Sequence, residues 1–98
     1  MRFTLYFTPN AKHALKDLKG SPDLHKRYKA VTKALRYLQE NPKHPGLQTH
    51  KYHSIHGSGG GEIFEAYAEQ NTPAAYRIFF YYGPERRSIT IFAITAHP

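Results

Sequence analysis

The sequence predicts a single α+β domain over residues 1–98: an N-terminal strand, a helical hairpin, and then a mostly antiparallel sheet of about four strands. Three observations predict it. Residues 3–7 alternate between apolar and polar, apolar residues recur at helical spacing between residues 11 and 38, and two apolar segments close the chain, joined by a short turn. A helical hairpin laid on a sheet buries the apolar side of both.

The first strand and the first helix follow from the opening 20 residues. Phe3, Leu5 and Phe7 alternate with polar or amphipathic residues, which is the period of a half-buried strand. The segment 8–10 interrupts this alternation. A short amphipathic helix is expected after it, ending at Gly20.

A second, longer helix is predicted to begin at the segment 21–23. Ser21 is the expected N-cap, with a proline in the first turn and an acid facing the helix dipole. One apolar stripe then follows, made of Leu24, Tyr28, Val31, Leu35 and Leu38. Basic residues are expected to fill the outer surface, namely Lys26, Arg27, Lys29, Lys33 and Arg36. The helix should end at Asn41-Pro42.

The segment 47–55 is predicted to form a short strand, followed by a glycine-rich loop. His50, His53 and His56 would share one face of a helix, but in a strand residues three apart point to opposite faces. Without cysteine, we expect no metal site and no cofactor here. His50, Lys51 and His53 are candidate RNA contacts or proton donors, with a polar edge strand as the structural alternative.

Composition points to a polyanionic partner. The net charge is +7, and eleven of the 14 Lys and Arg residues, but only three of the seven Asp and Glu residues, precede Glu62. Such a charge fits nucleic acid or an acidic protein segment, although solubility alone would also explain it. The chain has no cysteine and no apolar run long enough to span a membrane, so we expect a cytoplasmic protein with no membrane partner.

Arg77 is the most informative residue, because it lies inside a strand otherwise built of Ile, Phe and Tyr. Charged groups are rarely buried without a partner. In an antiparallel hairpin the start of one strand lies beside the end of the next, so Arg77 and His97 are predicted to be neighbours. A cation beside an imidazole indicates a place where a phosphate is handled.

Strand alternation predicts a chemical face of the sheet around this pair. The last strand should place its odd-numbered residues, Ile89 to His97, on one side, if no bulge interrupts it. With the helices on the other face, the predicted patch consists of Glu65, Tyr67, Arg77, Tyr81 and His97. The structural alternative is a simple Glu65–Arg77 cross-strand ion pair with a frayed His97.

Over nearly its whole length the chain resembles the RelE/ParE toxin superfamily of bacterial type II toxin-antitoxin systems. The most specific part is the strand Tyr76-Arg77-Ile78-Phe79-Phe80, followed by a strand that ends at His97. The rest of the resemblance is one of pattern only, in the opening strand, the helices ending at Asn41-Pro42 and the segment 47–52. The resemblance implies an α+β toxin held inactive by a cognate antitoxin, and in many members an endoribonuclease that cuts messenger RNA on the ribosome.

The resemblance also implies roles for the candidate residues. Arg77 matches the family's core arginine and would stabilise the phosphate, and His97 matches a C-terminal histidine that would act as acid or base. Glu65 or His50 would take the complementary role in metal-independent chemistry. The RNA backbone would be held by Lys51, Arg86 and Arg87, and an unpaired base would stack on Tyr67 or Tyr81.

Other functions remain open from the sequence. Several ribonuclease members carry a tyrosine at or near the C-terminus, where this chain has Pro98, and the segment 65–69 is acidic and aromatic where an arginine is frequent. These differences favour a non-catalytic protein, either a gyrase inhibitor or a degenerate member that only binds its antitoxin. A host RNA-binding domain without toxicity is a third possibility.

Overall fold

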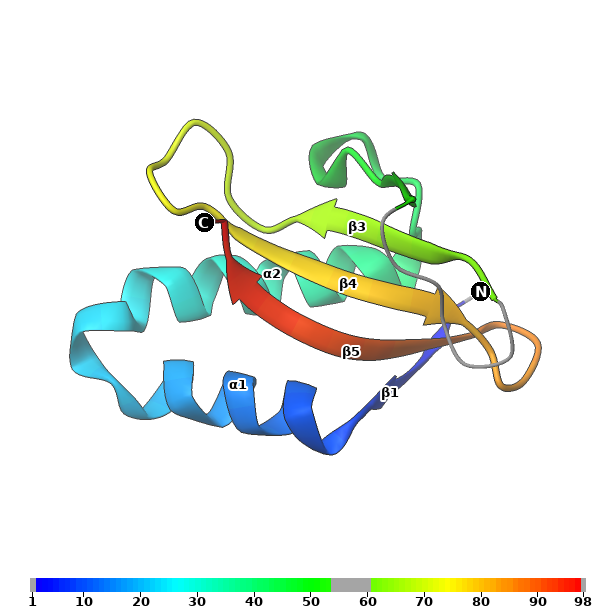
Figure 1. Ribbon diagram of the computed structural model, residues 1–98, viewed down its shortest axis with the longest axis horizontal. Coiled ribbons are helices and arrows are strands. Elements are labelled where there is room, and N and C mark those ends of the chain that lie inside the picture. The colour runs from blue at the N-terminus through cyan, green and yellow to red at the C-terminus, as the bar shows by residue number, and fades with distance from the viewer. Residues whose placement is uncertain (1, 54–60, 98) are drawn as a thin grey trace.

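A computed structural model describes residues 2–53 and 61–97 (Figure 1). Two helices and five strands follow the predicted order; their bounds are β1 (Thr4–Phe7), α1 (Pro9–Gly20), α2 (His25–Glu40), β2 (His50–Tyr52), β3 (Ile63–Tyr67), β4 (Tyr76–Tyr82) and β5 (Ser88–Ala96). Two short 3₁₀ helices, Pro22–Leu24 and Pro45–Leu47, lie before α2 and before β2. The α+β architecture predicted from the sequence is confirmed.

The five strands form one sheet in the order β1-β5-β4-β3-β2. Strand β1 pairs with β5 in parallel, and every other neighbouring pair is antiparallel. The N-terminal strand therefore joins the sheet beside the last strand of the chain, as Figure 1 shows. His97, the last described residue, lies at the end of the sheet where β4 begins, close to the loop between β3 and β4.

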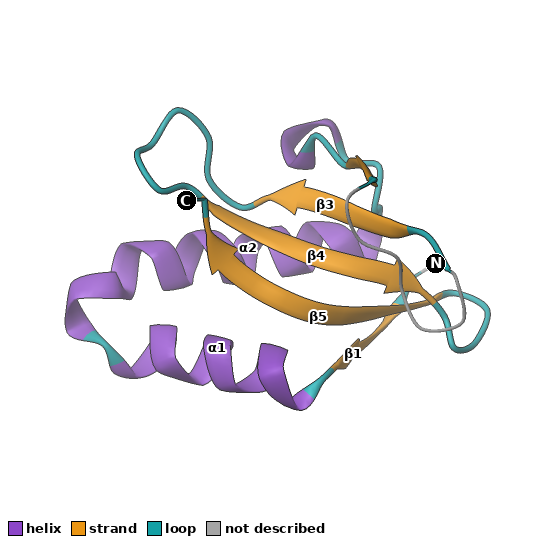
Figure 2. Ribbon diagram, viewed as in Figure 1, coloured by secondary structure: helices purple, strands orange, loops and turns teal. Residues whose placement is uncertain are grey.

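Both helices cover one face of the sheet and leave the other face to the candidate site (Figure 2). The core between them combines the predicted stripe of α2 with apolar side chains from the sheet; its fully buried members include Val31, Leu38, Ile78, Phe80, Ile89 and Ile91. Burial of each such side chain contributes about 1.5–3 kcal/mol relative to exposure. This layer fixes the orientation of the central strands, and strand alternation then determines which side chains reach the opposite face.

The start of α2 differs from the prediction. Ser21 caps no backbone N–H with its side chain; its hydroxyl donates to the carbonyl of Asp17 at 2.9 Å, in the last turns of α1. Ser21 is also the C-cap of α1, where its backbone N–H donates to the carbonyl of Leu18. The proline and acid that follow form a 3₁₀ turn, and α2 begins at His25.

Strand β5 contains a bulge at Phe92, because its register with β4 passes from Phe79↔Ala93 to Phe80↔Ile91. The prediction that the odd-numbered residues of this strand share one face is therefore wrong. One extra residue inverts the alternation on one side of the bulge. As a result, three isoleucines of β5 face the helices: Ile89, Ile91 and Ile94.

Within residues 2–53 and 61–97, neither α1 nor α2 has the length and apolar character needed to cross a membrane. The glycine-rich loop and His56, which the sequence singled out, lie largely or wholly outside the described residues.

Candidate functional site

The face opposite the helices carries a network of His50, Glu65 and Arg77. The register opposes His50 to Glu65, and Tyr67 to Arg77, so strand pairing alone brings the three polar side chains together. Arg77 Nη1 donates to Glu65 Oε2, and His50 Nε2 lies 2.7 Å from Glu65 Oε1. The Glu65 side chain is only 3% exposed and has a partner at each oxygen, whereas the His50 side chain is 46% exposed.

His50 is held at both ring nitrogens. Its Nδ1 lies 2.9 Å from the carbonyl oxygen of Gln48, while Nε2 faces the Glu65 carboxylate. Both partners are acceptors, and these two contacts fix the plane and the position of the imidazole.

Arg77 lies along the ring of Phe79, with its guanidinium carbon 5.1 Å from the ring centroid. Its side chain is 12% exposed. Among the described residues, nothing accepts a hydrogen bond from the buried Nε. A guanidinium has five N–H groups in a rigid fork. Glu65 engages Nη1 and so fixes the position of Arg77.

Aromatic rings extend this face in both directions. Tyr67 lies 5.6 Å from His50, measured between ring centroids. Tyr81 shares the face of Arg77 by alternation along β4, and its ring is 6.1 Å from that of Phe92 at the bulge. Tyr67 thus lies beside the network, and Tyr81 lies farther along the same face.

His97 lies directly after β5 and shares the face of Arg77. Its backbone N–H donates to the carbonyl of Ala75 at 2.8 Å, which extends the antiparallel register by one residue beyond Tyr76↔Ala96. Arg77 itself is opposite Thr95, so His97 is its diagonal neighbour. The His97 side chain is exposed, as is that of His50, whereas Glu65 and Arg77 are largely buried.

The structure separates Lys51 from this site. Lys51 is opposite Phe64, so it points away from the face of its neighbour His50, and its Nζ lies 2.7 Å from Glu62 Oε2. The extended backbone of β2 imposes this alternation. We therefore leave Lys51 out of the site itself.

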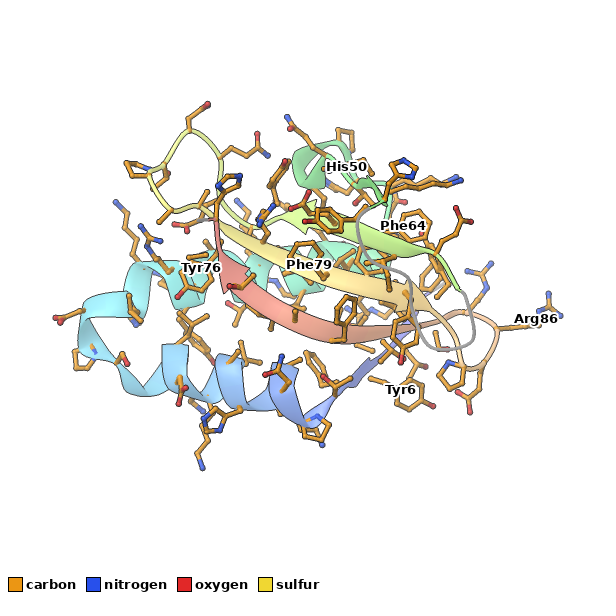
Figure 3. All side chains as sticks on the ribbon, viewed as in Figure 1. Tyr6, His50, Phe64, Tyr76, Phe79 and Arg86 are labelled. Atoms are coloured by element: carbon orange, nitrogen blue, oxygen red, sulfur yellow. The ribbon has the colours of Figure 1, made fainter. Side chains whose placement is uncertain are left out.

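Arg86 and Arg87 lie in the turn at the other end of the β4–β5 hairpin. Figure 3 shows Arg86 and Tyr76 at opposite ends of the sheet. Tyr82 lies five positions after Arg77 in β4, or roughly 17 Å away at the usual rise per residue. Arg87 lies over the ring of Phe3 at 5.8 Å. These two arginines can contact only a distant part of a ligand bound at Arg77.

The same end of the hairpin is tied to β1 by a tyrosine. Tyr6 Oη donates to Glu85 Oε1 at 2.5 Å. This hydrogen bond raises the pKa of the Tyr6 phenol, because the phenolate would lose the donated proton and face a carboxylate.

Arg27 was predicted to lie on the outer surface of its helix, and this is wrong. Its side chain is 25% exposed and donates to the carbonyls of Ala74 at 2.6 Å and Pro73 at 3.0 Å. Its guanidinium also lies 5.4 Å from the ring centroid of Tyr76. Arg27 therefore clamps the β3–β4 loop to α2. The separation of more than 40 residues left no signal of it in the sequence.

Replacing Arg27 with alanine should free the β3–β4 loop and weaken the anchoring of His97. Loss of hydrogen bonds from a charged group should lower the free energy of unfolding by about 1.5–3 kcal/mol. Hydrogen exchange should accelerate at the amides of Tyr76 and His97 in particular. Lys26→Ala, one residue earlier and exposed, is the control. Equal exchange at these amides in both variants would contradict the clamp.

No group of three or more His, Cys, Asp or Glu side chains in the described part of the chain is placed to hold a metal ion. His50 is in β2 with its ring nitrogens on Glu65 and Gln48, and His53 follows in a turn. This face presents a fixed cation, an imidazole and phenols.

Comparison with known proteins identifies the fold. No family model and no curated protein sequence matches the chain. Among solved structures, it is similar to a chain of the crystal structure of the archaeal RelE-RelB complex from Pyrococcus horikoshii OT3, with a TM-score of 0.64 over 98% of this chain and 96% of that chain. The chain has a RelE-like fold. The sequence identity is 16%, so the likeness is one of fold.

The RelE-like fold accounts for the position of the site. Its two helices cover one face of the sheet. The His50–Glu65–Arg77 network, the two tyrosines and His97 all lie on the other face. Four of the predicted residues thus come together around Arg77, namely Glu65, His50, Tyr67 and His97. Tyr81 lies farther along the same face, and Lys51, Arg86 and Arg87 lie apart.

Proposed function

We propose that this protein is the toxin of a type II toxin-antitoxin system and acts as a metal-independent endoribonuclease on ribosome-bound messenger RNA. Its partners would be the message, the ribosome and a cognate antitoxin, and its place of action the cytoplasm. The observation that carries the proposal is the position of Arg77 and His97 as diagonal neighbours on the open face of a RelE-like fold.

The proposed reaction is transesterification followed by release of two RNA ends. A base removes the proton of a ribose 2′-OH, the oxygen attacks the adjacent phosphorus, and the 5′-oxygen leaves with a proton from an acid. The products are a 2′,3′-cyclic phosphate and a 5′-OH. Arg77 stabilises the charge that develops on the phosphoryl oxygens, and His97 acts as acid or base.

The complementary proton transfer is assigned to His50. Glu65 has both oxygens engaged, which makes it a positioning residue that orients His50 and Arg77. Release of His50 Nδ1 from the Gln48 carbonyl would free a proton for the leaving oxygen. Tyr67 and Tyr81 are proposed to stack unpaired bases, whereas Arg86, Arg87 and Lys51 would hold distant backbone phosphates.

A second candidate is a non-catalytic toxin that inhibits gyrase or only binds its antitoxin. The observation that favours it is the same His50–Glu65–Arg77 network, because Glu65 already binds Nη1 of Arg77 and Nε2 of His50. A cation engaged by a buried carboxylate contributes less to a transition state than a free one.

Induction of the protein in a bacterial host separates these candidates. The ribonuclease should arrest growth and produce new RNA ends inside translated messages within minutes. Growth arrest with a DNA-damage response and no new RNA ends would instead support the gyrase inhibitor. Absence of any growth effect would contradict both toxic functions.

A further inference from the structure

The loop between β3 and β4, residues 68–75, anchors the residue that follows β5. The carbonyl of Ala75 in this loop accepts a hydrogen bond from the backbone N–H of His97 at 2.8 Å. Arg77 follows the loop in β4 and is fixed by Glu65, whereas His97 lies beyond the last paired residue of its strand. The position of His97 relative to Arg77 therefore depends on how firmly the loop is held.

Two residues of this loop have a backbone conformation that needs support from outside the loop. The φ angles of Asn71 and Ala74 are 57° and 54°, in the left-handed region that residues with a Cβ rarely adopt. A short polar side chain such as that of asparagine tolerates this region, but alanine has none. A strained backbone of this kind persists only where surrounding contacts hold it. Ala74 is therefore the point of the loop at which a clamp matters most.

Arg27 supplies contacts to both ends of the loop. At the end that leads into β4, its two terminal nitrogens donate to the carbonyls of Pro73 and Ala74. At the end that follows β3, Nη1 lies 3.8 Å from Glu69 Oε1, which also accepts the backbone N–H of Tyr76 at 3.0 Å. A planar guanidinium can hold two carbonyls side by side, which the single ammonium of a lysine cannot reproduce. One side chain of α2 thus closes the loop.

We propose that Arg27 is a positioning residue for His97, although the two side chains belong to opposite layers of the fold. Arg27 holds the carbonyl of Ala74, and the next residue, Ala75, holds the backbone of His97. Without the clamp, Ala74 relaxes from its positive φ and the Ala75 carbonyl moves with it. A misplacement of about 1 Å can lower a catalysed rate by about 10²-fold. The inference rests on the proposed function, because it assumes that His97 transfers a proton during RNA cleavage.

Cleavage of ribosome-bound messages by folded variants measures this effect. Arg27→Ala should lower the rate at saturating protein by about 10- to 100-fold, and the protein concentration that gives half of this rate should stay nearly unchanged. Arg27→Lys keeps the charge but loses the fork, so it should recover little of the rate. Lys26→Ala removes an exposed charge from the same helix and should keep the saturating rate. Urea unfolding of each variant shows that folded proteins are compared.

The His97→Ala background separates positioning from a general loss of structure. If Arg27 acts through His97, Arg27→Ala should cause almost no further loss of rate in a protein that already lacks the imidazole. A general structural effect would instead lower the rate by the same factor in both backgrounds. That result, or an undiminished rate of the Arg27→Ala single variant, would overturn the proposal.

NMR signals of the His97 ring test the link without any RNA. They should shift or broaden in Arg27→Ala and stay unchanged in Lys26→Ala. If the unsubstituted protein cuts no RNA, the ribonuclease is contradicted, and the ring signals still decide whether Arg27 positions His97. Ring signals that are the same in Arg27→Ala and in the unsubstituted protein would overturn the positioning role.

Discussion

His97→Ala should lower the rate of RNA cleavage by about 10²–10⁴-fold, the usual contribution of a positioned acid or base. The side chain is exposed at the end of the sheet, so the variant is expected to fold, and urea unfolding of the variant checks this. Cleavage of a message on translating ribosomes, followed by primer extension, measures the rate. Growth arrest on induction should be lost in parallel.

Thr95→Ala is the matched control for His97→Ala. Thr95 lies two residues earlier on the same face, is also exposed, and is opposite Arg77. The Thr95→Ala variant should cleave RNA at close to the rate of the unsubstituted protein. Arg77→Lys adds a test of the cation, because it keeps the charge for Glu65 but loses the planar fork. Full growth arrest by both the His97→Ala and Arg77→Ala variants, at normal protein levels, would refute the catalytic assignment.

Glu65→Leu should destabilise the protein by about 3–5 kcal/mol, because it leaves the buried Arg77 without its partner. Arg77 is 12% exposed and Glu65 3%, so neither charge is compensated by water. The double substitution Glu65→Leu/Arg77→Leu should recover most of this loss, since an apolar pair can replace a buried ion pair at little cost. Urea unfolding of the Glu65→Leu, Arg77→Leu and double variants measures the coupling energy between the two side chains.

The double variant also separates stability from function. We expect it to be folded yet unable to cleave RNA or arrest growth, because the phosphate-binding cation is gone. A double variant as unstable as the sum of the two single variants would show that Glu65 and Arg77 are not energetically coupled.

Much of the fold follows from the periodicity of the sequence. The stripe that includes Val31, Leu35 and Leu38 is helical in spacing and packs on the sheet as predicted. The face to which each side chain of β5 points does not follow from periodicity. The bulge at Phe92 inverts the alternation, so that the core isoleucines before it, Ile89 and Ile91, have odd numbers and the one after it, Ile94, has an even number. A local pattern could not reveal that bulge.

The candidate site was predictable only in part. An arginine in an apolar strand and a histidine at the end of its partner were visible in the sequence, and the structure places Arg77 and His97 on one face. The contacts of both Glu65 oxygens, one with His50 and one with Arg77, were not visible, since they depend on three strands meeting in register. The role of Arg27 was hidden for the same reason, because its partners lie 46 and 47 residues away.

The basic residues of the chain are spread over several parts of the surface. Arg86, at the tip of the β4–β5 hairpin, is remote from the start of β4, where Arg77 lies, and the lysines of the helices are exposed on the other layer. A ligand that used all of these charges would have to be much larger than one nucleotide. This agrees with the proposed substrate, a message held in a large RNA-containing particle.

The most direct test of the central claim uses a message with one altered sugar. Ribosomes are programmed with two messages that are identical except for a 2′-deoxynucleotide at the mapped cleavage position, and purified protein is added to each. The account predicts that the unmodified message is cut to a 2′,3′-cyclic phosphate and a 5′-OH end, and that the deoxy message stays intact. Cleavage of both messages, or of neither, would contradict it.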